Sequence, residues 1–327
     1  MMIEAGRLGL GLAPALMILT LLLLPDASPA GVVQQWGQLR VIRGQLCDER
    51  GNPVQLKGMS THGLQFFPVS KSTIDHMVDD WHCTVIRAAM YTKEKGYIDH
   101  PARLKDQVKL VVDQCIARGI YVIIDWHILS DNDPNIYRDE ARAFFDEMSA
   151  TYGRYPNVLY EICNEPHDCS WTGEIKPYAE AIIPVIRANA PGSVIICGDE
   201  NWSSEPQAAA NMPLDLPNIL YTLHYYAATH ALDQWMQKVD SCMAKGCAVF
   251  VSEWSTCEAN GDGRIDLPRS QRMVDFLAAK KVSWCIWALS PGNHSCDILK
   301  PGAGIDGPWS DDQLSITGRF ARENIVK

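Results

Sequence analysis

The sequence predicts one (β/α)₈ barrel, an α/β protein in which a parallel sheet closes on itself. The 327 residues are 47% hydrophobic, which is enough material for one large core. Apolar runs of strand length alternate with stretches of helical length, and no Gly-, Ser- or Pro-rich linker separates them. Strands that are apolar on both faces and alternate with helices form a parallel sheet covered by helices. Eight such repeats predict closure into a barrel.

Residues 1–30 differ from the rest and are expected to be a secretory signal peptide. Arg7 precedes an apolar stretch over 8–24, and Ser28 and Ala30 supply the small residues that precede a cleavage site. An uncleaved membrane anchor is the alternative, but the stretch is short and interrupted for a span. We expect cleavage near Ala30, which leaves 31–327 as a single barrel domain in a secreted, extracellular protein without membrane contact.

The predicted elements follow in chain order. A small hairpin over 37–41 and 45–48 comes first. Ser72 offers a cap at one helix start, Gly119 ends a helix, and Pro268 suits a first helical turn. The predicted strands are 54–58, 84–88, 121–125, 158–162, 194–197, 219–223, 248–251 and 283–287. The predicted helices are 72–82, 101–118, 138–153, 174–190, 204–211, 230–245, 268–281 and 311–325.

Charge and cysteine content limit the partners. A formal charge of −10 argues against nucleic acid or an anionic membrane surface, and ten Trp in an acidic chain suit a neutral polymer. The eleven Cys are an odd number, and export favours some disulfides. Cys242 with Cys247 is the best local pair, and Cys257 with Cys296 is possible if their loops are neighbours. No Cys-x-x-Cys or His-x-x-x-His spacing occurs, so we expect neither a metal nor a cofactor.

Polar and aromatic residues follow every predicted strand. In a barrel of this kind functional residues lie just beyond the carboxyl ends of the strands, on one rim. Two of them are carboxylates, Glu165 in Asn164-Glu165-Pro166 and Glu253 in Ser252-Glu253-Trp254. Two carboxylates are what glycoside hydrolysis requires. The other candidates are His62, Arg87, Tyr91, His127, Asn164, Trp202, His224, Tyr226 and Trp287.

Residues 36–327 closely resemble glycoside hydrolase family 5, in its bacterial-type endoglucanase branch. The most specific motifs are Arg87 at the second strand, Asp125-Trp126-His127, Asn164-Glu165-Pro166, His224-Tyr225-Tyr226 and Ser252-Glu253-Trp254. The resemblance implies a barrel that cleaves β-1,4-glucan with retention. It also implies that Glu165 is the acid/base and Glu253 the nucleophile.

The chemistry gives each neighbour a role. Glu165 must hold a proton near neutral pH, so enclosure and the second carboxylate must raise its pKa. Glu253 must stay ionised, which Arg87 and the Tyr226 hydroxyl suit. Asn164 can bind the sugar 2-hydroxyl. His127 and His224 orient the acid and the sugar, Trp287 offers an apolar floor, and His62, Tyr91 and Trp202 line neighbouring subsites. Asp125 is interpreted as structural.

The chain departs from the branch it resembles at three places. Residues 290–293 lack the Lys that usually grips a glucose, Ser255 replaces a Gly, and Phe66-Phe67 replace a Trp. These changes leave the chemistry intact and put subsite affinity and the choice of glucan in doubt. Two glycosylation sequons, at Asn201 and Asn293, also fall on the predicted rim.

The favoured hypothesis is a monomeric endo-β-1,4-glucanase, a cellulase whose partner is a β-glucan polysaccharide. One alternative keeps the mechanism and changes the polymer to mannan, xyloglucan or mixed-linkage glucan. A catalytically silent carbohydrate-binding barrel is a second alternative, and the retained carboxylates argue against it. A metal-dependent hydrolase would require clustered His and Asp ligands, which the spacing does not favour.

Overall fold

Eight parallel strands form a closed barrel in the computed structural model, which describes residues 1–2 and 31–327. β11 pairs with both β3 and β10, and these pairings close the ring. The (β/α)₈ prediction is therefore confirmed; the predicted signal peptide lies outside the described residues. The strands are β3 (Lys57–Thr61), β4 (Val85–Tyr91), β5 (Tyr121–His127), β6 (Val158–Glu161), β7 (Ile195–Cys197), β8 (Ile219–Thr222), β10 (Ala248–Ser255) and β11 (Trp284–Leu289). A two-residue strand, β9 (Tyr225–Tyr226), pairs with the end of β10.

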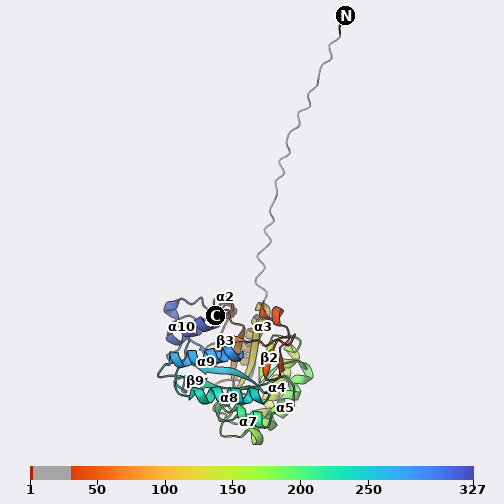
Figure 1. Cartoon of the computed structure of the whole chain (residues 1–327), viewed down its shortest axis with the longest axis vertical. Helices are drawn as coiled ribbons and strands as arrows, with labels where there is room; N and C mark the ends of the chain where they lie inside the picture. Colours follow the sequence, from red (N-terminus) through yellow and green to blue (C-terminus); the bar gives the residue numbers. More distant parts are fainter. Residues whose placement is uncertain (3–30) are drawn as a thin grey trace. The chain divides into compact units, whose positions relative to one another are not determined.

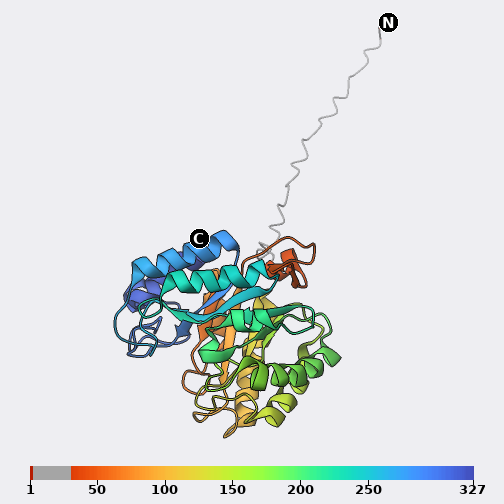
Figure 2. The same cartoon turned by 60° about the horizontal axis from the view of Figure 1, so that its bottom comes forward.

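Helices cover the outside of the barrel. Figure 1 shows α8 and α9 side by side along one side, and Figure 2 shows strands running through the middle of the fold. No described helix is both long and apolar enough to cross a membrane. The main helices are α2 (Lys71–Asp79), α3 (Pro101–Arg118), α4 (Arg138–Tyr152), α5 (Lys176–Asn189), α7 (Pro206–Asn211), α8 (Leu232–Ala244), α9 (Leu267–Lys280) and α10 (Ile316–Val326). The short ones are α1 (Val32–Trp36), α6 (Glu200–Ser203), a π-helix (Trp171–Ile175) and a 3₁₀ turn (Asp311–Gln313).

Two helix-end predictions hold and one is wrong. Gly119 adopts the left-handed conformation, with φ of 67°, directly after α3, and Pro268 lies in the first turn of α9. The cap of α2 is Ser70 and not Ser72. The Ser70 side chain accepts from the Thr73 N–H and the Thr73 hydroxyl accepts from the Ser70 N–H, so the cap lies two residues earlier than predicted and the helix begins at Lys71.

Alternation along each strand divides its side chains between two environments. On β4, Ile86, Ala88 and Met90 pack outward among the helices, whereas Val85 and Arg87 lie on the opposite, inward face. The same period of two holds in the other strands, since successive side chains of a strand point to opposite faces. This alternation brings residues from different strands together inside the barrel.

The amino-terminal end of the barrel is closed by apolar residues. A hairpin of β1 (Arg40–Ile42) and β2 (Gln45–Cys47) flanks it, and Leu39 and Leu46 join the inner cluster of the strands. Val54 and Leu56 belong to the same cluster. The first strand therefore begins at Lys57 and not at 54 as predicted, because the apolar run 54–56 packs as part of this closure.

Every cysteine is a free thiol in residues 31–327, which contain all eleven of them. The expected pair Cys242 and Cys247 is not bonded. Cys242 is buried on α8, whereas Cys247 follows the turn and is only half-buried. Cys257 and Cys296 do lie next to each other, as thiols.

Candidate active site

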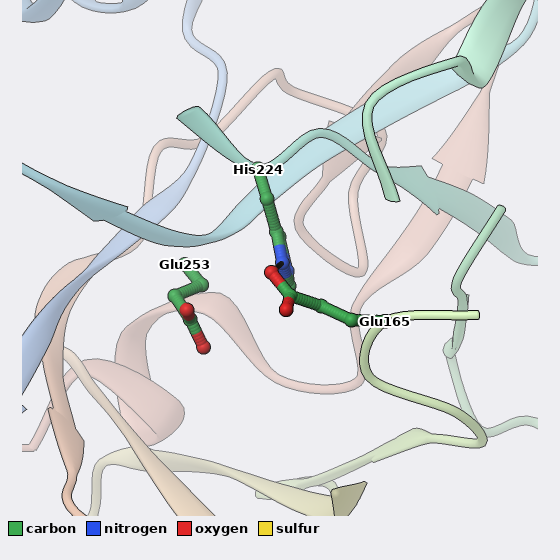
Figure 3. A group of neighbouring side chains, drawn as sticks. All are labelled: Glu165, His224 and Glu253. Atoms are coloured by element: carbon green, nitrogen blue, oxygen red, sulfur yellow. Dashed lines mark hydrogen bonds and ion pairs between the residues drawn. The ribbon is translucent and has the colours of Figure 1, made fainter. Parts of the chain in front are cut away.

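Two carboxyl groups face one another at the carboxyl end of the barrel. Glu165 lies just beyond β6 and Glu253 lies within β10, and Figure 3 shows the imidazole of His224 against the Glu165 carboxyl. One carboxyl oxygen of each glutamate and one ring nitrogen of His224 all lie within 4.8 Å of one another. The fold therefore brings both carboxyl groups together at one place on the rim.

Arg87 lies at the centre of a buried charge network beneath these groups. Its Nη1 is 3.0 Å from Glu253, its Nε is 2.6 Å from Glu161 and its Nη2 is 3.0 Å from Asp125. None of the side chains of Arg87, Asp125 and Glu161 is accessible to solvent. Burial of a single charge would cost several kcal/mol, so one guanidinium fork that holds three carboxylates organises the whole set.

The alternation of the strands explains why these charges meet. Val85 and Arg87 are two residues apart on β4, as are Ile123 and Asp125 on β5. Ala89 pairs with Asp125 and Asp125 with Glu161 across the neighbouring strands. The lower inward residues are apolar and the next inward positions are charged, so the network begins one layer above the apolar closure.

Glu253 receives donors from two sides. The Arg87 Nη1 lies at 3.0 Å from one carboxyl oxygen and the Tyr226 hydroxyl donates to the other at 2.8 Å. Both donors stabilise the ionised form. Burial raises the pKa of Glu253, as does the Glu165 carboxylate nearby. The two donors therefore place the negative charge of the pair on Glu253.

Glu165 is in the opposite situation. Burial raises the pKa of Glu165 to about 7. Its carboxyl oxygen is 2.8 Å from His224 Nδ1, and burial lowers the pKa of His224 to about 4, so this ring is neutral above that pH. Glu165 is therefore the carboxyl of the pair that keeps its proton near neutral pH.

A hydrogen-bonded chain determines which nitrogen of His224 carries the hydrogen. Ser252 donates to Glu161 at 2.5 Å, and its oxygen lies 3.0 Å from His224 Nε2. Since Ser252 has one hydroxyl hydrogen and uses it on Glu161, its oxygen accepts from Nε2–H. The neutral ring then presents a bare Nδ1 to Glu165, which favours the protonated carboxyl.

His127 and Asn164 lie on the other side of the pair. His127 Nδ1 is 2.6 Å from Asp125, and its Nε2 is 3.3 Å from the Asn164 amide nitrogen. The Asn164 amide oxygen accepts from Arg87 Nη2 at 2.6 Å. Burial lowers the pKa of His127 well below its usual range, and burial raises the pKa of Asp125 to about 7. The sequence prediction placed His127 and Asn164 in the site, and both face the Arg87 network.

The carboxyls lie where two hollows meet, and both hollows include Glu165 and Tyr226. One, of about 280 Å³, contains the predicted residues His62, Tyr91, His127, Glu253 and Trp287. The His127 and Trp287 rings stack at 5.2 Å and those of Tyr91 and His127 are 4.1 Å apart. The other hollow, of about 490 Å³, contains Trp202 and His224 together with His230 and Trp235. The cleft thus extends to both sides of Glu165.

Trp202 is held at the edge of the cleft by an unusual turn. Asn201, Trp202 and Ser203 all have positive φ, at 57°, 56° and 54°, which is costly for residues with a side chain. The Trp202 N–H donates to the Pro166 carbonyl, and its ring stacks on His167 at 4.7 Å. Trp202 is 47% exposed and offers a free ring face to the cleft.

Sequence reasoning missed three members of the site: Glu161, Ser252 and Thr222, whose hydroxyl is 2.5 Å from that of Ser252. It interpreted Asp125 as a structural hydrogen-bonding group, and the Asp125 carboxylate does contact Arg87 and His127. One signal was present. A charged residue, Glu161, inside the apolar run 158–162 requires a buried partner, and Arg87 provides it.

Comparison with known proteins identifies the family. The family model for cellulase, glycosyl hydrolase family 5, matches residues 47–293. The chain belongs to glycosyl hydrolase family 5. An endoglucanase from Clostridium saccharobutylicum is 48% identical over 292 residues, which cover 88% of this chain and 65% of the relative. Endoglucanase A from Evansella cellulosilytica is 50% identical over 304 residues, 92% of this chain and 62% of the relative. The chain therefore spans less than two thirds of the length of these two relatives.

Solved family 5 structures share the barrel. The catalytic domain of Thermobifida fusca endoglucanase Cel5A has a TM-score of 0.88 at 40% identity, and the match covers 91% of this chain and 100% of that domain. A variant of the same domain, crystallised in complex with cellotetraose, has a TM-score of 0.87 at 39% identity. The family assignment thus agrees in sequence and in fold.

Proposed function

We propose that this protein is a secreted endo-β-1,4-glucanase that hydrolyses internal glucosidic bonds with retention, with Glu165 as acid/base and Glu253 as nucleophile. The observation that carries the proposal is the pair of carboxyl groups in one cleft, with oxygens within 4.8 Å. Retaining glycosidases place their carboxyls about 5 to 5.5 Å apart, whereas inverting enzymes need about 6.5 to 9.5 Å to admit a water. Relatives named as endoglucanases support the choice of polymer.

In the first step the ionised Glu253 attacks the anomeric carbon while Glu165 protonates the departing glucosidic oxygen. Arg87 and the Tyr226 hydroxyl keep Glu253 ionised and aim its oxygens. His224 accepts the hydrogen bond of the protonated Glu165 until the leaving oxygen takes that proton. The product of this step is a glucosyl ester on Glu253 and a free chain end.

In the second step the now ionised Glu165 takes a proton from water, and that water attacks the anomeric carbon. The bond to Glu253 breaks, and the two inversions leave the original configuration. We assign the sugar 2-hydroxyl to Asn164, and we assign the stacked rings of His127 and Trp287 as an aromatic wall for the pyranose ring. Trp202 is a stacking platform on the far side of Glu165.

The test combines substrate range with stereochemistry. Carboxymethyl cellulose, mixed-linkage glucan, xylan and mannan are compared side by side with the wild type and with Glu253→Ala. We expect the highest kcat/KM on a β-1,4-glucan and the β-anomer as first product by proton NMR. Glu253→Ala should lose at least about 10⁴-fold in rate. Full activity in that variant, or a first product with the α configuration, would overturn the mechanism. A preference for mannan or xylan would overturn the substrate assignment alone.

A further inference from the structure

Two cysteine thiols lie side by side beneath one wall of the cleft. Cys257 follows β10 and Cys296 follows β11, and their side chains pack in the same buried cluster. Neither has a role in the proposed hydrolysis. Backbone contacts fix their positions independently. The Cys296 N–H donates to the Gly261 carbonyl at 3.0 Å, and the Cys257 carbonyl accepts from the Ala228 N–H at 3.1 Å.

The two loops that carry these thiols form part of the cleft. Ala259, Asn260 and Gly261 from the first loop line the same hollow as His294 and Cys296 from the second. The Ser295 N–H and hydroxyl both donate to Asp262 at 3.0 Å, which joins the loops a second time. Cys257 and Cys296 pack with Tyr226 and Trp287 in one small apolar cluster. A disulfide between Cys257 and Cys296 would join the loop that follows β10 to the loop that follows β11.

A second thiol pair provides a comparison within the same chain. Cys163 and Cys197 also pack near one another, but both are completely buried in the main core. Neither lines the cleft. Cys296, by contrast, is 4% exposed and borders the hollow that contains Glu253. Of these two pairs, only Cys257–Cys296 borders the cleft, through Cys296.

We propose that Cys257 and Cys296 form a redox-active dithiol that oxidises to a disulfide across the two cleft loops. The oxidant is a dissolved or protein-borne disulfide. Cys296 first forms a mixed disulfide and releases one reagent thiol. The Cys257 thiolate then attacks the Cys296 sulfur and releases the second reagent thiol. Two protein thiols lose two electrons and two protons, and one reagent disulfide becomes two thiols.

The bond would restrain the unfolded chain by closing a loop between the two cysteines, so it should raise thermal stability. It connects two segments that the reduced protein holds only by hydrogen bonds and packing. Since neither sulfur forms a hydrogen bond with Glu165 or Glu253 in the described residues, we expect kcat/KM of the folded enzyme to stay within about twofold of the reduced form.

The test uses the folded wild-type chain and oxidised glutathione. After incubation the protein is quenched in acid, denatured and alkylated, and the alkylated thiols are counted by intact mass and located by peptide mapping. We expect two fewer alkylated thiols than in the reduced protein, a Cys257–Cys296 linked peptide, and a midpoint of thermal unfolding raised by several degrees. After treatment with dithiothreitol, the protein should again show eleven alkylated thiols.

Variants sharpen the result. In Cys257→Ser, treatment should remove only one alkylated thiol relative to the reduced variant. The lost thiol is Cys296, which should remain as a stable glutathione adduct because no Cys257 thiolate is present to attack it. Cys163→Ser is the matched control and should still form the Cys257–Cys296 bond. Eleven alkylated thiols in the treated wild type would overturn the proposal. So would a linked peptide that joins Cys163 to Cys197 in place of the expected pair.

Discussion

The same strands form both ends of the barrel, but the side chains that they direct into the barrel differ between the two ends. At the amino-terminal end the inward residues are apolar, as with Ile123 and Phe250, and the hairpin residue Leu46 packs against them. One layer higher they are Arg87 and Glu161, completely buried and charged. The first end stabilises the fold by excluding water. The second holds charge in a low-dielectric interior, where each group keeps its place only through its partners.

The two layers should respond differently to substitution. In the apolar layer a smaller side chain leaves a cavity, which lowers the free energy of unfolding but leaves no charge without a partner. In the charged layer the loss of one group leaves its partners buried without compensation, which lowers the free energy of unfolding and also disturbs the carboxyl groups at the rim. Changes at the two ends should therefore separate unfolding free energy from catalytic rate.

Arg87→Ala should produce the largest effect. It leaves the carboxylates of Asp125, Glu161 and Glu253 without their shared cation. We expect a loss of about 3 to 5 kcal/mol in unfolding free energy and of at least about 10³-fold in kcat/KM. Urea unfolding and hydrolysis of carboxymethyl cellulose measure the two. Arg87→Lys keeps the charge without the fork, so it should recover stability more than activity. Wild-type values in both variants would contradict the central role of Arg87.

Phe250→Ala tests the apolar end. Its side chain is completely buried in the closure cluster. We expect a loss of about 3 to 5 kcal/mol in unfolding free energy, with kcat/KM within about twofold of wild type well below the unfolding midpoint. A fall in kcat/KM as large as that of Arg87→Ala would show that the two ends are not separable.

The pH dependence of kcat/KM reports on the charged layer. Glu165 acts when protonated and has a pKa of about 7, so activity should fall as pH rises through about 7. The groups that face it from the surrounding elements are Arg87, Tyr91, Asp125, His127, Glu161, His167, His224, Tyr226 and Glu253.

Ser252→Ala should move that alkaline limb to lower pH by about one unit. Without Ser252, His224 is free to carry its hydrogen on Nδ1 and donate to the ionised Glu165, which lowers the pKa of Glu165. Profiles of kcat/KM between pH 5 and pH 9 on a soluble glucan give the midpoint of the alkaline limb for the wild type and for Ser252→Ala. An unchanged limb would mean that Ser252 does not control the tautomer.

Trp202→Ala should have the smallest effect of the series. The ring is 47% exposed at the cleft edge and stacks on His167. We expect KM on long glucans to rise by about tenfold, in line with about 1 kcal/mol or more of stacking, with little change in kcat. An unaltered KM would remove Trp202 from the substrate path.

Sequence alone predicted the barrel because each strand and helix has its own period, and the rim residues followed from the barrel rule. It missed Glu161 and Ser252 because they point inward below the rim, where register between strands decides contacts. The start of β3 was wrong because an apolar closure and an apolar strand look alike in sequence. Which thiols lie together likewise depends on loops that are distant in the chain.

The most direct test of the account is to trap the covalent intermediate on Glu253. A 2-deoxy-2-fluoro-β-cellobioside with a good leaving group slows both steps but lets the first proceed, so the sugar accumulates on the nucleophile. Intact mass and peptide mapping after incubation show whether and where it is attached. We expect one equivalent of fluorocellobiosyl ester on the peptide that contains Glu253, and none in Glu253→Ala. An ester on the Glu165 peptide, or turnover with no ester on either peptide, would contradict it.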